Sequence, residues 1–177
     1  MSNQGFNNME VTSLKKEERT IAVNAIFLDS DGRILLGKRA AHKSGGGQWG
    51  LPGGTQEKGE KYQETLIREM KEELGVDVVE YRYSNFFQCI VSEKVHFDHH
   101  AFVVTKWNGD IVNNEPNKCD ELRWFGIDEL PWDNFFVSAR NIVNYILGEQ
   151  YLEGTDFDYR DPKTTIIKAP DFLVNND

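Results

Sequence analysis

The sequence feature that most constrains the fold is a glycine-rich segment, residues 42–59, that leads directly into a helix with regularly spaced glutamates. The segment has few apolar side chains and is predicted to be a long loop, and long ordered loops in compact domains are often functional. The helix is expected to begin near Glu60 and to end at Gly75, because glycine commonly terminates helices. Its buried stripe is expected to comprise four residues that fall within an arc of about 100°: Leu66, Ile67, Met70 and Leu74.

Three carboxylates share one flank of this helix, because Glu69, Glu72 and Glu73 stand at positions i, i+3 and i+4. Carboxylates this close together repel one another unless a cation binds between them, and oxygen ligands at this density suit Mg²⁺ or Mn²⁺. Arg68 lies four residues before Glu72 and can hold that carboxylate in place. Taken alone, the fragment is also compatible with a solvated, salt-bridged helix, because such charge runs are common.

The loop before the helix completes a longer pattern. From Gly54 to Val76 the chain reads G-x5-E-x7-R-E-U-x-E-E-x-G-U, in which U is a bulky apolar residue and every fixed position is filled. A chance match to its seven fixed letters is expected on the order of once in a million chains of this length. The pattern resembles the signature of the Nudix hydrolases. The resemblance extends over roughly residues 20–147, through four flanking segments: 34–39, 49–54, 115–116 and 121–130.

The remaining hydrophobic patterns predict strands at 21–28, 34–36, 78–91, 100–107 and 121–125, a second helix at about 137–147 and a short strand at 164–168. The first two strands are expected to form a hairpin around a turn at 29–32. This order indicates an α/β domain with a mixed or mostly antiparallel sheet. The resemblance implies a Nudix fold of the α+β kind, with a mixed sheet sandwiched between helices. The chain then divides into a polar N-terminal extension (1–19), a Nudix domain (20–150) and a C-terminal tail (151–177).

In the family, the glutamates of the signature hold divalent metals, Mg²⁺ or Mn²⁺. Carried onto this sequence, the metal-binding set would be one backbone carbonyl and three carboxylates: Gly53, Glu69, Glu72 and Glu73. Relatives often add a carboxylate from a later loop as ligand or general base. Glu115, beside Pro116, is the candidate here, and an exposed loop acid is an equally good interpretation of it. With Arg68 these glutamates form the candidate catalytic set, whereas Glu60 is expected to support the loop.

The reaction that the resemblance implies is attack of water on a phosphorus of a nucleoside diphosphate linked to another group. Cations must then neutralise the phosphates. Because side chains alternate along a strand, only one of Lys38 and Arg39 is expected to face them, and Arg39 is preferred. Asn134 resembles a position that reads the base edge in some relatives, or is a plain turn residue. Core packing is the commoner role for any single aromatic, but several could stack on a base: Trp49, Phe97, Trp132, Phe135 and Phe136.

Three histidines lie close together in the segment 96–100. On a strand, His96, Asp98 and His100 would share one face, and His99 would point to the other. A metal cluster at these residues is the weaker interpretation, because a zinc site needs more ligands or an open catalytic position. His96, followed by Phe97, resembles the part of the sheet that lines substrate pockets in the family, so contact with the base or sugar is the stronger interpretation.

The charge distribution suits a small anionic substrate better than a nucleic-acid polymer. The formal net charge is −9, and a field of that sign repels nucleic-acid backbones and anionic lipid. The excess lies in residues 74–177, whereas residues 1–56 carry a net +2 and residues 57–73 a net −2. Cys89 and Cys119 are too few for a disulfide framework, and no segment resembles a signal peptide or a membrane helix. We therefore expect a cytoplasmic protein without a membrane partner, and a homodimer is left open.

Together these features predict a Mg²⁺-dependent enzyme that hydrolyses a nucleoside triphosphate to a nucleoside monophosphate and pyrophosphate. The alternative is a nucleotide-sugar or dinucleotide diphosphatase of the ADP-ribose or GDP-mannose type. A binding module of the same fold without catalysis would be expected to lack carboxylates of the signature, and none is missing here.

Overall fold

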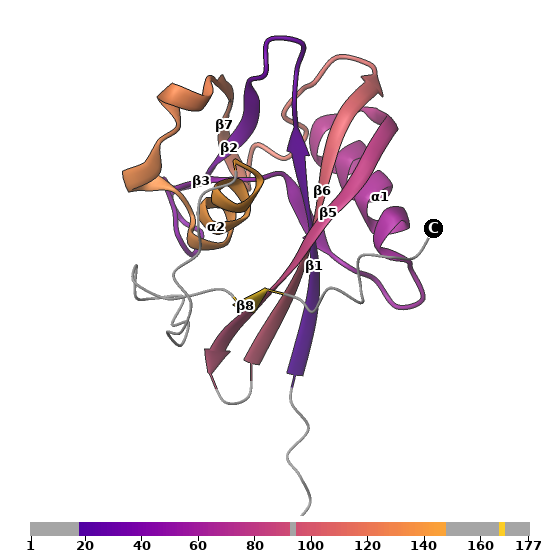
Figure 1. Cartoon of the computed structure of the whole chain (residues 1–177), viewed down its shortest axis with the longest axis vertical. Coiled ribbons are helices and arrows are strands. Elements are labelled where there is room, and N and C mark those ends of the chain that lie inside the picture. The colour runs from indigo at the N-terminus through magenta and orange to yellow at the C-terminus, as the bar shows by residue number, and fades with distance from the viewer. Residues whose placement is uncertain (1–17, 93–94, 148–166, 169–177) are drawn as a thin grey trace, which may run out of the picture.

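The computed structural model describes residues 18–92, 95–147 and 167–168, which form two β-sheets and two α-helices (Figure 1). The helices are α1 (Tyr62–Leu74) and α2 (Val137–Ile146), with two short 3-10 helices, η1 (Ile127–Glu129) and η2 (Trp132–Asn134). The strands are β1 (Glu18–Phe27), β2 (Ile34–Arg39), β3 (Trp49–Gly50), β4 (Gly53–Thr55), β5 (Asp77–Ser92), β6 (Val95–Asn108), β7 (Cys119–Phe125) and β8 (Ile167–Lys168). The expected N-terminal extension and C-terminal tail lie outside the described residues, except for 18–19 and 167–168.

The larger sheet is mixed, as predicted, with the strand order β4-β1-β6-β5-β8. Strands β1 and β6 are parallel, and their register places Glu18 opposite Val95 and Phe27 opposite Val104. The other neighbouring strands of this sheet pair antiparallel. The smaller sheet, β3-β2-β7, is antiparallel throughout. The helices α1 and α2 lie on opposite sides of the long strands (Figure 1), so the predicted sandwich is confirmed. Neither helix of the described part is long and apolar enough to cross a membrane.

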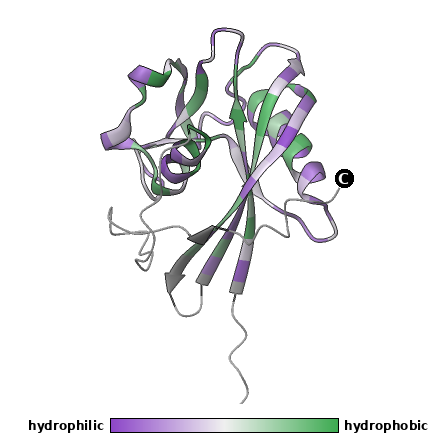
Figure 2. Ribbon diagram, viewed as in Figure 1, coloured by the Kyte–Doolittle hydropathy of each residue, from purple (hydrophilic) through white to green (hydrophobic). Residues whose placement is uncertain are grey.

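Two hydrophobic cores form, one on each face of the larger sheet. Successive residues of β1 point to opposite faces, so Ala25 and Phe27 pack with α1 while Ile26 packs with α2. All three side chains are fully buried, which explains the continuous apolar run in this strand. Hydrophobic and hydrophilic residues alternate in colour along α1 and along the long strands (Figure 2), as expected for elements with one face against a core.

The predicted hairpin of the first two strands is wrong. Strands β1 and β2 belong to different sheets, and the backbone pairing between the two segments is a single antiparallel bridge between Leu28 and Ile34. Both edges of β1 are already paired, one with β4 and the other with β6, so no edge is left for β2. The glycine-rich segment is also more ordered than predicted, because β3 and β4 form within it.

Helix α1 ends as predicted, with Gly75 in the left-handed conformation at a φ of 74°. It begins at Tyr62, where the Glu64 carboxylate accepts a hydrogen bond from the Lys61 N–H at 2.7 Å. The predicted buried stripe is wrong at Ile67, which is 44% exposed. The buried residues are instead Thr65, Leu66, Glu69, Met70 and Leu74. The helix is therefore rotated so that the flank with the glutamates, rather than the flank with Ile67, turns toward the body of the protein.

Candidate active site

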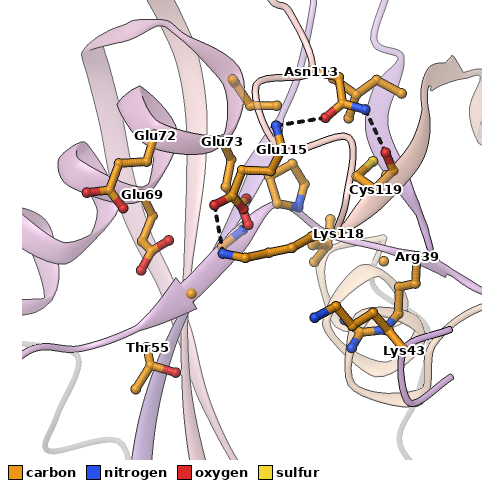
Figure 3. A pocket seen from close by; sticks show the side chains of 18 of the residues that line it. Arg39, Lys43, Thr55, Glu69, Glu72, Glu73, Asn113, Glu115, Lys118 and Cys119 are labelled. Carbon is orange, nitrogen blue, oxygen red and sulfur yellow. Dashed lines mark hydrogen bonds and ion pairs between the residues drawn. The ribbon is translucent and has the colours of Figure 1, made fainter. Parts of the chain in front are cut away.

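A cavity of ≈ 620 Å³ opens between α1, the strands β2 to β4 and the segment that precedes β7 (Figure 3). Side chains of both charges line it. In Figure 3, Glu69 and Glu72 lie across the cavity from Arg39 and Lys43. The acidic residues of the lining are Glu57, Glu69, Glu72, Glu73 and Glu115, and the cationic ones are Lys38, Arg39, Lys43, Arg68 and Lys118. The fold thus brings every predicted metal-binding residue to one place, because Gly53 lines the same cavity.

The carboxylate of Glu69 packs directly on the backbone of β4. Any side chain at position 54 would collide with this carboxylate, so the close approach requires Gly54. This contact explains the glycine that opens the signature. Glu69 is buried, and burial raises the pKa of its carboxyl above the ordinary value.

Arg68 connects the carboxylates of α1 to the loop before it. Its guanidinium donates to Glu60 at 2.7 Å, to Glu69 at 2.8 Å and to the Thr55 carbonyl at 3.0 Å. The predicted contact with Glu72 is also present, at 3.1 Å. The hydrogen bond with Glu60 contributes most to raising the pKa of Arg68, and the same bond lowers the pKa of Glu60 to about 2. Glu60 is thus engaged in holding the loop, as expected, and Arg68 orients the other carboxylates.

Glu73 and Glu115 come from neighbouring segments, because the Asn114 N–H donates to the Glu73 carbonyl at 3.0 Å. Glu73 accepts a hydrogen bond from the Gly53 N–H at 2.8 Å, and burial raises its pKa to about 7, with smaller contributions from Glu69 and Glu115. Glu115 accepts from the Lys118 ammonium at 2.7 Å through Oε1. Its Oε2 is buried and has no hydrogen-bond partner among the described residues.

These carboxylates fit a divalent cation. Four of them line one cavity, one of their oxygens is buried without a partner, and their mutual repulsion together with burial favours neutralisation by a cation. Within residues 18–92, 95–147 and 167–168, no three His, Cys, Asp or Glu side chains already converge as metal ligands. Arg68 and Lys118 instead hold Glu69, Glu72 and Glu115. A rearrangement of these side chains would be needed to complete a metal site.

Lys38 and Arg39 both line the cavity, although strict alternation would allow only one. The pairing of β2 with β7 shifts between these two residues, and such a bulge interrupts the alternation of side chains. Arg39 is held in place, because its guanidinium lies 4.5 Å from the Phe136 ring centroid and donates to the Ser44 carbonyl at 2.9 Å.

A second cavity, of ≈ 430 Å³, adjoins the first and shares Arg39 and the backbone of 53–55 with it. Its other walls are mainly apolar and include Phe97 and Phe136. Polar atoms come from His99 and Asn24, whose Nδ1 and Oδ1 lie 2.9 Å apart. Burial lowers the pKa of His99 to about 4, so its ring is neutral at pH 7. The second cavity therefore presents aromatic rings and an uncharged polar pair, with Arg39, Ser44 and Ser138 also in its lining.

Five residues predicted to contact substrate or able to stack on a base line neither cavity: Trp49, His96, Trp132, Asn134 and Phe135. Trp49 is buried and packs edge-on against Phe125, with 4.9 Å between ring centroids, so it serves the core. Asn134 donates to the Gly47 carbonyl at 3.1 Å and ties η2 to the glycine-rich loop. His96 lies on the face of the sheet that packs with α1. The second cavity is on the opposite face, where His99 lines it instead.

In the part of the chain that the structure describes, the side chains of 96–100 do not form a group of three or more His, Cys, Asp or Glu that could hold a metal. His100 stacks on Tyr62 with 3.6 Å between ring centroids, and its Nδ1 lies 3.0 Å from the Tyr83 hydroxyl. Asp98 accepts a hydrogen bond from Gln88 at 3.0 Å. The alternation predicted for these residues is correct. Asp98, His99 and His100 contact side chains outside this segment, whereas the Nδ1 of His96 is buried with no hydrogen-bond partner among the described residues.

Several residues of the site were not predicted. Lys43 and Lys118 line the first cavity, and Asn24 lines the second. Asn113 accepts from the Glu115 N–H at 3.1 Å and donates to the Cys119 carbonyl at 2.7 Å (Figure 3). The spacing of Lys118 three residues after Glu115, across a turn with Pro116, is the one local signal that could have indicated a pair.

Comparison with known proteins gives one consistent result. The NUDIX domain profile matches residues 18–145. The chain is 34% identical over 98 residues to a CTP pyrophosphohydrolase of Escherichia coli strain K12. The matched segment covers 55% of this chain and 71% of the relative. It is 31% identical to an 8-oxo-dGTP diphosphatase of Buchnera aphidicola subsp. Schizaphis graminum, over 54% of this chain and 69% of that one. A crystal structure of a MutT NUDIX hydrolase from Burkholderia pseudomallei superposes with a TM-score of 0.64 at 29% identity and covers 70% of this chain and 95% of its own.

The domain match includes β1 to β7, α1, nearly all of α2 and the residues of both cavities. The signature supplies three of the carboxylates of the first cavity, Glu69, Glu72 and Glu73, and the similar crystal structure carries a MutT name. Members of this family typically depend on a divalent metal, in agreement with the carboxylate set. By this domain match and these relatives, the chain belongs to the Nudix hydrolase family and is a MutT-like Nudix pyrophosphohydrolase.

Proposed function

We propose that the enzyme hydrolyses a nucleoside triphosphate to a nucleoside monophosphate and pyrophosphate, with Mg²⁺ or Mn²⁺ as cofactor. The observation that carries this proposal is the pair of adjoining cavities, one charged and one aromatic, with Arg39 in the wall between them. A charged cavity suits a polyphosphate, and an aromatic one suits a base. The names of two relatives, CTP pyrophosphohydrolase and 8-oxo-dGTP diphosphatase, support a triphosphate substrate.

In this proposal the cations of the first cavity bind the phosphate chain. Arg39 is already oriented by Phe136 and the Ser44 carbonyl, so little conformational entropy is lost when it binds an anion. Lys38 and Lys43 line the same cavity and add positive charge. These side chains would hold the triphosphate with the bond to be broken next to the carboxylates of α1.

The metal would be held by the Gly53 carbonyl and by Glu69, Glu72, Glu73 and Glu115, and it would supply neutralisation of phosphate charge and a lower pKa for a bound water. In the hydrolysis, the oxygen of water bonds to phosphorus and the bond from that phosphorus to the bridging oxygen breaks. Glu115 has one buried oxygen without a partner, so it is placed either to bind the metal or to accept the proton of the water.

The second cavity would hold the base between Phe97 and Phe136. When the Nδ1 of neutral His99 donates to Asn24, its Nε2 remains as an acceptor. The Asn24 amide nitrogen remains as a donor. This pair can therefore hydrogen-bond a base edge that carries a donor and an acceptor side by side.

A substrate panel in Mg²⁺ tests the proposal. It contains the four common NTPs and dNTPs, 8-oxo-dGTP, ADP-ribose and GDP-mannose, and release of pyrophosphate and monophosphate is measured. We expect at least one triphosphate to yield pyrophosphate and monophosphate in equal amounts. Cleavage of ADP-ribose or GDP-mannose without turnover of any triphosphate would favour the alternative diphosphatase activity and overturn the proposal.

A further inference from the structure

Lys118 places its ammonium group among the carboxylates of the first cavity. Its Nζ lies 2.7 Å from Oε1 of Glu115, and Figure 3 shows the side chain reaching from the segment before β7 toward Glu115 and Glu73. Both lysine and carboxylates line one cavity, so Lys118 lies in the field of the residues proposed to hold the metal.

The backbone around Lys118 is fixed, whereas its side chain has one described ion pair. Its N–H donates to the Glu115 carbonyl at 2.8 Å, and its carbonyl accepts from the Ala40 N–H at 2.9 Å. The side chain is 56% exposed and pairs with a single carboxylate. Rotation of the side chain alone would free Glu115 without disturbing the loop.

Arg68, the other cation beside these glutamates, differs from Lys118. Its side chain is 22% exposed, and it contacts the Thr55 carbonyl as well as Glu60, Glu69 and Glu72. Several simultaneous contacts and burial hold a guanidinium in place, whereas one exposed ion pair exchanges readily. Lys118 is therefore the cation that can leave when another cation arrives.

We propose that Lys118 is the resident counter-ion of Glu115, which a divalent metal must displace before that carboxylate can bind it. This inference rests on the proposed metal-dependent function. Oε2 of Glu115 has no partner while Lys118 occupies Oε1, so the carboxylate is only half neutralised and retains attraction for a stronger cation. Lys118 acts as a positioning residue that sets the metal affinity, and once displaced it remains beside the phosphate-binding cations.

The test is Mn²⁺ binding to the substrate-free enzyme, measured from the electron paramagnetic resonance signal of free Mn²⁺. We expect Lys118→Met to bind Mn²⁺ about three- to tenfold more tightly, because the competing ammonium is gone. Lys118→Arg retains a cation and should stay near the wild-type affinity. The control is Lys106→Met, which changes net charge equally but removes an exposed 2.8 Å pair with Glu80. This variant should bind as the wild type does.

A double-mutant cycle isolates the pair. In a Glu115→Gln background, Lys118→Met should no longer change the Mn²⁺ affinity. Unchanged or weaker binding by Lys118→Met in the native background would overturn the inference and leave the proposed function intact. Absence of saturable Mn²⁺ binding to the wild-type enzyme would instead overturn the metal-dependent function itself, so the two failures are distinguishable.

Discussion

The two adjoining cavities share a wall and differ in nearly every physical property. The first is lined by five acidic and five cationic side chains, and the second mainly by apolar and aromatic ones with a neutral histidine. Phosphates and metals are the same in every triphosphate, whereas bases differ in shape and hydrogen-bonding edge. Under the proposed function, bond breaking and base selectivity depend on separate cavities. Variants in the first cavity should then change kcat for every substrate, and variants in the second should change the preference among bases.

The largest effect is expected from Glu73→Gln in the charged cavity. Removal of this carboxylate should lower kcat by about 10²- to 10⁴-fold for every triphosphate alike, because the lost charge serves a step common to all of them. Steady-state kinetics on several NTPs measure it, with the exposed and distant Glu80→Gln as the control. More than a tenth of the wild-type kcat in Glu73→Gln would contradict the role of this cavity.

A smaller effect is expected from Arg68→Met, which breaks the network behind the carboxylates rather than the carboxylates themselves. We expect kcat to fall by about 10- to 100-fold, because residues that orient metal ligands typically contribute that much. The free energy of unfolding should also fall, because Glu60 and Glu69 lose a charged partner. Chemical denaturation and kinetics check both, and normal stability with normal kcat would show that Arg68 orients nothing.

In the aromatic cavity, Phe97→Ala should raise KM by about tenfold while kcat changes little, because stacking holds the base without taking part in bond breaking. The increase should differ from base to base. Phe86→Ala is the matched control, since Phe86 contacts His100 on the opposite face of the sheet. A lower kcat with unchanged KM in Phe97→Ala would remove the distinction between the cavities.

The smallest effect is expected from His99, whose uncharged ring lines the second cavity. The pKa of His99 is about 4 in the folded protein, compared with 6.5 for an exposed histidine of the unfolded chain. As the pH falls, the unfolded chain therefore binds the proton before the folded protein does. This site therefore contributes stability above pH 6.5 that is lost between 6.5 and 4, by up to about 1.4 kcal/mol per pH unit. The pH dependence of the unfolding free energy should be less steep in His99→Leu than in the wild type. Parallel curves would mean that His99 titrates normally.

The charged cavity was largely predictable from the sequence, because its carboxylates lie on one helix, where spacing alone fixes their common flank. Glu69, Glu72, Glu73 and Arg68 reach the cavity as their positions in the signature suggest. Ile67 was wrongly predicted to be buried. Hydrophobic periodicity predicts the width of the buried stripe of a helix, but it does not predict the rotation of the helix about its axis, which here buries Glu69 and exposes Ile67.

The aromatic cavity was not predictable to the same degree. The walls that it does not share with the first cavity come mainly from β1, β5, β6 and the start of α2, and long-range strand pairing brings these strands together. Alternation along β6 correctly separated His96 from His99, but nothing local says which face meets the cavity. The pairing of β1 with β4 and β6, which also overturned the predicted hairpin, decides that His99 lies beside Asn24.

The most direct test of the central claim is a ³¹P nuclear magnetic resonance time course of the best triphosphate with wild-type enzyme and Mg²⁺. If the two cavities act on one substrate as proposed, signals of pyrophosphate and nucleoside monophosphate should grow together as the triphosphate disappears, and addition of a metal chelator should stop them. Formation of orthophosphate with nucleoside diphosphate, or no cleavage of any triphosphate, would contradict the account.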